Sequence, residues 1–264
     1  MFFFPKRMGS ERDTVARKTA TLDVVQEAPP PRRNQTNLVE QAYEQLESLI
    51  IVCELKPGSV MSIQDLQRIA GSSRTPVHQA VNRLAADTLL TVQPRQGIRI
   101  APIDLARERL LLQLRRDLER FVLALVIERS TGTYRSQMTH IARALRERRE
   151  TMTIGEFNTF DRRIDKVLLL AAGEPFLEHT LRPLHTIFRR IGWIHHQHVG
   201  GEASLFGTID CHIAVLDAVV NRRVPQALEA SDGLITFVDG MFDAIEREVD
   251  PALLDSSLEP LPGI

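Results

Sequence analysis

Two short stretches of helical character are separated only by a short break at Ala70-Gly71-Ser72-Ser73, and this break constrains the fold more than any other feature. Ser62 is a suitable N-cap for a helix over 63–69, and Ser73 for a second helix from Thr75 to about Asp87. Pro76 falls in the first turn of the second helix, where its missing N–H costs no hydrogen bond. The pattern therefore predicts two consecutive helices joined by a tight turn.

The segments on either side of this helix pair complete a known order of elements. Apolar residues from Leu38 to Ile50 fall on one face of a preceding helix, which a turn follows. Two short β-like stretches, 89–93 and 98–101, are joined by Pro94-Arg95-Gln96-Gly97, a hairpin with turn residues. This is the order of a winged helix-turn-helix, which we assign to residues 38–103.

The remainder, 104–250, shows no convincing strand and predicts six or seven helices. Their connections are expected at Gly132, Gly155, Gly173-Glu174-Pro175, Gly200-Gly201 and Arg222 to Pro225. Helices of this length with short connections predict an antiparallel bundle. We expect residues 1–37 to be a flexible tail, because they lack a sustained apolar period, and 251–264 to be a frayed end. The fold class is therefore mainly α, with an N-terminal winged helix-turn-helix and an all-helical domain.

The overall charge does not point to nucleic acid, since the formal net charge is -1. Its distribution is more informative, because no acid occurs from Leu66 to Ala86 while arginines do, and Arg95 and Arg99 follow. This local basic field suits a polyanion, although a chance asymmetry on a solvated surface is equally open. The two cysteines are far apart and no apolar run is long enough to span a bilayer, so we expect a cytoplasmic protein without a membrane partner.

The start of the second helix carries side chains that a DNA-reading helix needs. Arg74 can form a bidentate pair with guanine, and Gln79 can do so with adenine. The hydroxyls of Ser73 and Thr75 suit phosphate, and Arg95-Gln96 at the hairpin tip can reach the neighbouring minor groove. The other interpretation is a surface helix with ordinary polar residues.

Four segments keep a characteristic spacing: Ile51 to Gly58, Leu66 to Gly71, Ser73-Arg-Thr-Pro-Val77 and Gln93-Pro-Arg-Gln-Gly97. Together they resemble the DNA-binding domain of the GntR superfamily, and the helical remainder is similar to its FCD subgroup. The resemblance implies a double-stranded DNA operator as partner. It also implies a set of DNA-contacting residues: Gln64, Ser73, Arg74, Thr75, His78, Gln79, Arg95, Gln96 and Gly97.

Several of these residues depart from the family pattern. His78, Gln79 and Gln96 stand where the family usually has Arg, Glu and Arg, and Gln64 stands where some members have a DNA-contacting Arg. Arg74 matches the family. We therefore expect Arg74 to be the principal base reader, and the family's familiar operator should not be assumed.

Asp161 and Asp165 are one helical turn apart in the helical domain, so their carboxylates share a face. The resemblance implies a metal site here, in which Asp161 is a ligand, Asp165 replaces a His, and His212 supplies another ligand. Leu234 aligns with the last His and cannot coordinate a metal. Three O,O,N ligands can still hold a divalent ion such as Zn, Ni or Mn. The alternative is that Asp165 pairs with a nearby Arg and no metal binds.

Arg115 and Glu119 match a family motif in which the arginine points into the effector cavity. The resemblance thus implies a small anionic effector, a carboxylate, bound by Arg115, Asp161, Asp165 and His212. The alternative is a structural ion pair between Arg115 and Glu119, which is four residues on. We interpret the histidines that follow Trp193 as a polar helix end rather than a site: His195, His196 and His198.

The resemblance implies a ligand-responsive transcription regulator, usually a repressor, that binds a palindromic operator as a homodimer and is released by a small anionic metabolite. One alternative is a DNA-binding regulator without a metal or small-molecule effector, architectural or controlled by a protein partner. Another is a metal-dependent hydrolase built on Asp161, Asp165 and His212. The sequence contains no nucleophile elbow, phosphate loop or dinucleotide fingerprint, so we do not expect an enzyme.

Overall fold

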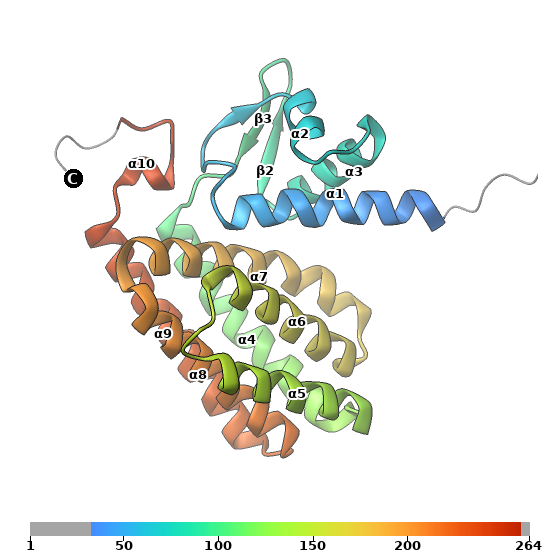
Figure 1. The fold of residues 1–264 in the computed structure, drawn as a ribbon, viewed down its shortest axis with the longest axis vertical. Helices are drawn as coiled ribbons and strands as arrows, with labels where there is room; N and C mark the ends of the chain where they lie inside the picture. Colours follow the sequence, from blue (N-terminus) through green and yellow to red (C-terminus); the bar gives the residue numbers. More distant parts are fainter. Residues whose placement is uncertain (1–32, 260–264) are drawn as a thin grey trace, which may run out of the picture. The chain divides into compact units, whose positions relative to one another are not determined.

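A short helix-turn-helix and a small antiparallel sheet make up the N-terminal part of the computed structural model, which describes residues 33–259 (Figure 1). The elements are α1 (Arg33–Ile51), β1 (Val60–Met61), α2 (Ile63–Ile69), α3 (Arg74–Ala86), β2 (Leu90–Gln93) and β3 (Gly97–Ile100). The strands lie in the order β1-β3-β2 and both pairs are antiparallel. The expected winged helix-turn-helix is thereby confirmed.

Local signals explain these elements. Ser62 and Asp65 form a reciprocal capping box at the start of α2, which satisfies two backbone N–H groups. Ser73 occupies the N-cap of α3, but its hydroxyl caps no backbone N–H. Gly97 has φ +120°, and a Cβ there would lie 2.7 Å from the carbonyl oxygen of Met61, so the hairpin needs a glycine.

Two sequence expectations at the N-terminal part need correction. The tail expected over 1–37 lies outside the described residues up to residue 32, but from Arg33 onward the chain is already helix α1. Strand β1 was not predicted, because it has only two residues and exists through its pairing with β3, Val60 opposite Arg99.

The rest of the described chain is helical, as expected. Its elements are α4 (Leu105–Arg129), α5 (Gly132–Arg148), α6 (Ile154–Ala172), α7 (Pro175–His195), the π-helical turn η1 (His196–Gly200), α8 (Gly201–Val220), α9 (Val224–Glu248) and α10 (Pro251–Leu254). The break expected at Gly155 is wrong, because Gly155 lies in the first turn of α6 and the chain instead breaks just before Thr153, the N-cap.

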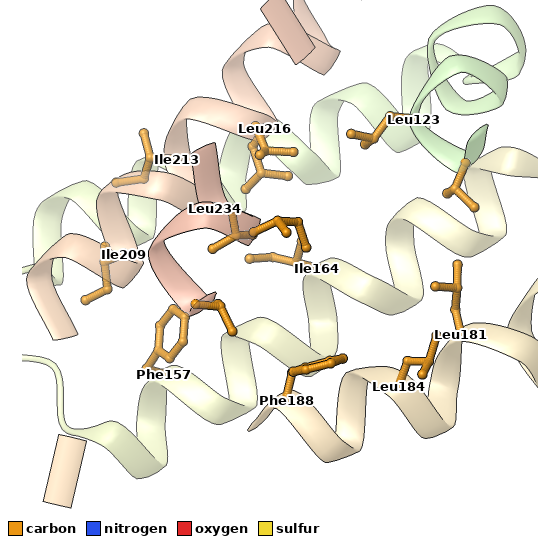
Figure 2. Close-up of a cluster of buried hydrophobic side chains, with 14 of the residues drawn as sticks. Leu123, Phe157, Ile164, Leu181, Leu184, Phe188, Ile209, Ile213, Leu216 and Leu234 are labelled. Atoms are coloured by element: carbon orange, nitrogen blue, oxygen red, sulfur yellow. The ribbon is translucent and has the colours of Figure 1, made fainter. Parts of the chain in front are cut away.

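The core of the helical part is built from six helices, α4 to α9. Helix α4 packs against α6, α7 and α9, and α8 packs against α5 and α9. Figure 2 shows the buried side chains where these helices meet: Leu123, Phe157, Ile164, Leu181, Leu184, Phe188, Ile209, Ile213, Leu216 and Leu234. The stretch Pro175–Val220 is long and apolar enough to cross a membrane by length and composition, with mean hydropathy 1.5, but it comprises α7, η1 and α8, whose apolar side chains supply much of this core.

Helix α7 also joins the two parts of the described chain. It packs against α1, and its Ile187 is buried in the N-terminal core rather than in the helical one. Arg190 of α7 donates a 2.8 Å hydrogen bond to the carbonyl of Ala101, in the segment between β3 and α4. A movement of α7 therefore reaches both cores.

The C-terminal segment docks onto the base of the wing. Ile103 N–H donates to the carbonyl of Leu254 at 2.8 Å, and Ser256 N–H to that of Pro57 at 2.8 Å. Arg99 of β3 forms an ion pair with Asp255 at 3.2 Å. The expectation of a frayed end does not hold for residues 251–259, because these contacts order the segment.

Candidate functional site

The first turns of α3 present a polar face to solvent. Pro76, Val77 and Ala80 are buried in the N-terminal core, which turns the intervening positions outward. The outward side chains are those predicted to contact DNA: Ser73, Arg74, Thr75, His78 and Gln79. His78 Nδ1 lies 3.3 Å from Asn82 Nδ2, and the other four side chains make no hydrogen bond to the described residues. The face is free to bind a ligand.

The remaining predicted DNA contacts lie at two neighbouring places. Gln64 is exposed at the start of α2, while Arg95 and Gln96 are exposed at the tip of the β2–β3 hairpin. Gly97 begins β3. Figure 1 shows α2, α3 and the hairpin on the side of α1 that faces away from the helical bundle. The predicted residues therefore belong to elements on one side of the molecule.

Three of the arginines that suggested a basic face are paired with acidic side chains. Arg68 pairs with Asp65 at 2.5 Å and Arg83 with Glu40 at 2.7 Å, and Asp255 likewise neutralises Arg99. Within residues 33–259, Arg74 and Arg95 form no ion pair, so of the arginines that suggested a basic face these two keep their charge available.

A continuous chain of charged side chains runs through the helical part, and we call it the ion-pair chain. Its members, in order of contact, are Arg115, Glu119, His185, Asp165, Arg189, Asp161 and His212. Arg115 Nε donates to Glu119 at 2.6 Å, and Arg189 Nε donates to Asp161 at 2.8 Å. Arg189 also donates to Asp165 through Nη2. These groups come from α4, α6, α7 and α8, so the ion-pair chain connects four helices.

Both histidines of the ion-pair chain are imidazolium ions. His212 donates from Nδ1 to the carbonyl of Thr208 at 2.8 Å and from Nε2 to Asp161 at 3.0 Å. His185 stands between the carboxylates of Asp165 and Glu119, at 3.1 and 3.3 Å. Both ring nitrogens donate only in the charged form. Burial alone would lower the pKa of each ring, but the carboxylates raise it above its ordinary value.

The predicted metal ligands do not fit a metal ion. The cation between Asp161 and Asp165 is the guanidinium of Arg189, which binds both carboxylates. Leu234 contributes only an apolar side chain, as expected, and lies in the hydrophobic core (Figure 2). No group of three or more His, Cys, Asp or Glu side chains between residues 33 and 259 is arranged to hold a metal. The pairing of Asp165 with a nearby arginine is the arrangement present.

A small cavity of about 40 Å³ lies beside the ion-pair chain. Arg115, Asp161, Arg189, His196 and His212 are among the residues that line it. Arg115 forms the ion pair with Glu119 that one interpretation expected, and it also lines this cavity. Asp165 does not line this cavity; its carboxylate accepts a hydrogen bond from Arg189.

His196 also lines the cavity, contrary to the interpretation of this region as a polar helix end. Its Nε2 lies 3.2 Å from the Thr208 hydroxyl, while its Nδ1 is buried without a partner among the described residues. Burial and the neighbouring His195 lower the pKa of His196 to about 4, so the ring is neutral. His195 is buried against Ser204, and His198 alone is exposed.

Sequence reasoning missed three residues of this site: His185, Arg189 and His196. Their spacing along α7 and into η1 was the available signal, because positions three, four and seven apart share a helix face. The spacing alone resembles ordinary amphipathic patterning, because the partners of these residues lie on other helices, Asp161 and Asp165 on α6 and Thr208 on α8.

Comparison with known proteins is consistent across the chain. The family model described as bacterial regulatory proteins of the gntR family matches residues 38–100, and the FCD domain matches residues 110–237. An uncharacterized HTH-type transcriptional regulator of Streptomyces ambofaciens is 28% identical over 209 residues, covering 78% of this chain and 84% of that protein. The uncharacterized HTH-type transcriptional regulator BphR of Paraburkholderia xenovorans is 30% identical over 78 residues, covering 30% and 32%.

Solved structures share the fold. McbR/YncC of E. coli superposes with a TM-score of 0.68 at 18% identity and covers 78% of this chain and 97% of that one. A putative transcriptional regulator GntR from Rhodococcus sp. RHA1 superposes with a TM-score of 0.58 at 14% identity, covering 78% and 97%. At this identity the likeness establishes the architecture of the two parts and their order.

Proposed function

Because this chain is a DNA-binding transcriptional regulator of the GntR family and carries an FCD domain, we propose that it acts in the cytoplasm as a ligand-responsive repressor. It binds a palindromic operator as a homodimer and is released by a small anionic metabolite. The family match and the names of its relatives identify a regulator rather than an enzyme, so the hydrolase alternative is excluded.

The observation that supports DNA reading most directly is the free polar face at the start of α3. Arg74 leads this face without an ion-pair partner in the described chain, and α2 and the wing add contacts beside it. We assign base reading to Arg74, with Gln79 and His78 beside it, and backbone or minor-groove contacts to Gln64, Ser73, Thr75, Arg95, Gln96 and Gly97.

The operator contacts can be tested with a duplex enriched from random DNA by the wild-type protein. Arg74→Ala should lose about 1–3 kcal/mol of binding free energy and relax the preference at one base pair. Arg163→Ala is the matched control, because this arginine is exposed on α6 and, within residues 33–259, its side chain forms a hydrogen bond with Gln137 alone. Equal affinity of Arg74→Ala and wild type in a titration at fixed salt would overturn the assignment.

An apolar stripe on α4 supports the homodimer. Leu110, Leu114 and Phe121 are 66%, 49% and 55% exposed and lie on one face of the helix, since they are four and seven residues apart. Two copies related by a twofold axis would cover the stripe with itself. In sedimentation experiments Leu114→Glu should shift the protein toward monomer, whereas Leu170→Glu on α6, 50% exposed, should leave it dimeric.

The charge balance of the ion-pair chain supports an anionic effector. Four cations, two arginines and two imidazoliums, face three carboxylates, which leaves one net positive charge in a buried place. A carboxylate in the adjacent cavity would neutralise it and could accept from the guanidinium of Arg115, beside the charge of His212. Asp161 and Asp165 then hold the cations in place rather than touch the effector through a metal.

The cavity volume suggests how binding would produce a signal. About 40 Å³ holds a few water molecules but not a whole organic acid, so an effector must separate the helices that line the cavity. A thermal-shift screen of organic acids and sugar acids tests this, with Arg115→Gln as the variant expected to lose the response. A regulator without a small-molecule effector would show no stabilisation by any acid and no release from the enriched duplex.

A further inference from the structure

The ring of Tyr43 on α1 is held between two arginines from different parts of the molecule. The guanidinium of Arg83 on α3 lies 4.3 Å from the ring centroid, and that of Arg182 on α7 lies 4.1 Å from it. Glu40 accepts from both arginines, at 2.7 and 3.0 Å. The Tyr43 hydroxyl donates at 2.6 Å to Asp87, the residue that ends α3. The proposed DNA-reading helix and a sensor helix therefore hold the same side chain.

A buried carboxylate on α1 continues this contact. Glu47 is 2% exposed and accepts from Thr186 Oγ1 on α7 at 2.7 Å and from the Tyr43 hydroxyl at 3.3 Å. Arg162 on α6 lies 3.6 Å away. Because a buried carboxylate that loses a donor pays the full desolvation cost of its charge, α1 must follow α6 and α7 when they move.

A cavity of about 170 Å³ joins this cluster to the ion-pair chain. Glu47 and Arg182 line it from the interface with α1, and Asp165, His185 and Arg189 line it from the sensor side. Arg182 and Arg189 are seven residues apart on α7 and so share one face. The same two turns of α7 thus contact the proposed effector site and the ring of Tyr43.

We propose that Tyr43, Glu47 and Arg182 form a coupling cluster. It transmits to α3 whether the proposed effector cavity, the cavity of about 40 Å³ beside the ion-pair chain, is occupied. They are positioning residues, since they touch neither the DNA-reading face nor the effector cavity. The proposal rests on the proposed function. Helix α7 moves when the cavity opens, and Tyr43 with its bond to Asp87 carries that movement to the end of α3.

A double-mutant cycle on operator affinity tests the coupling without a known effector. The DNA is again the duplex that the full-length wild-type protein enriches from random sequence. His212→Gln perturbs the cavity by removing one charge of the ion-pair chain. Tyr43→Phe removes the hydroxyl that bonds Asp87 and Glu47 but keeps the ring between the two arginines. Tyr134→Phe on α5 is the matched control, because the Tyr134 hydroxyl makes no hydrogen bond to the described residues.

We expect His212→Gln to change the dissociation constant roughly five-fold or more, the lower end of measured couplings. In the Tyr43→Phe background this change should shrink below about two-fold, and in the Tyr134→Phe background it should persist. A structural role of Tyr43 alone would leave the two effects additive. If His212→Gln does not fold, as its melting curve will tell, Leu234→Phe perturbs the same cavity by filling it.

The outcomes separate the two proposals. Failure to enrich any duplex overturns the proposed function and the coupling with it. Enrichment with no effect of the cavity variant, or with the same effect in wild type and Tyr43→Phe, overturns the coupling cluster alone and leaves DNA binding in place.

Discussion

Arg189 occupies the place between two buried carboxylates where the family resemblance implied a metal, and its removal is the sharpest test of that interpretation. The side chain is 5% exposed and binds Asp161 and Asp165, which are 12% and 14% exposed. Arg189→Met keeps the aliphatic stem and removes the charge. The two aspartates then face each other, each with one remaining imidazolium partner, His212 or His185.

The expected loss can be worked out in two ways. Breaking a buried ion pair by removing one partner costs roughly 3–5 kcal/mol, and the surviving imidazoliums place this case near the lower end. Two carboxylates about 6 Å apart on one helix face repel by about 3 kcal/mol at an effective dielectric constant of about 20. Both routes give about 3 kcal/mol, which corresponds to a fall in Tm of about 6–12 °C in a chain of this size.

Thermal unfolding followed by circular dichroism measures this loss. Arg163→Met is the control, an exposed arginine two residues after Asp161 whose replacement should stay within about 0.5 kcal/mol of wild type. Added Mn²⁺ should restore part of the loss in Arg189→Met by replacing the missing charge, and should leave wild type unchanged. A Tm for Arg189→Met within about 2 °C of wild type would refute the view that this guanidinium holds the site together.

Burial would raise the pKa of Glu119, but Arg115 and His185 lower it from 4.5 to about 2. The ionised carboxylate therefore stabilises the fold by about 3 kcal/mol above pH 4.5, and this stabilisation is lost as the pH falls toward 2. Urea unfolding midpoints measured in an acid series will show the loss. The pKa of His212 is raised above 6.5, so its stabilisation is complete below pH 6.5 and lost as the pH rises through the raised value; midpoints that stay flat there would contradict the imidazolium assignment. Gly58 has φ +78°, and a Cβ there would clash with the carboxylate of Asp255. Gly58→Ala should therefore expose the C-terminal segment to limited proteolysis. Gly132→Ala is the control and should not, because a Cβ at Gly132 meets open space.

Local chemistry made the winged helix predictable from sequence. The capping box at Ser62, the tight turn at Gly71 and the Pro94–Gly97 hairpin act within a few residues, so each could be recognised without knowing the rest of the fold. Strand β1 and the docking of residues 251–259 could not be recognised, because both depend on partners far along the chain, Arg99 above all.

The helical part shows the same contrast between residues that local motifs identify and partners that only the fold brings together. Asp161, His212 and Arg115 were found through motifs, which preserve residue type and spacing. Their partners were not, because a motif records neither the register of α7 against α6 nor which arginine stands opposite a carboxylate. Arg189 could fill the metal position only because α7 places its guanidinium between Asp161 and Asp165.

This substitution of a guanidinium for an ion changes what the sensor domain can transmit. A metal ion can bind and dissociate, so its binding can itself be a signal. A guanidinium is covalently part of its helix, so it can transmit a signal only when that helix moves. Arg189 and Arg182 lie two turns apart on the same face of α7, and Arg182 stacks on Tyr43 at 4.1 Å. An anion bound in the cavity, as we propose, would therefore act through α7, and Arg182 would pass that movement to Tyr43.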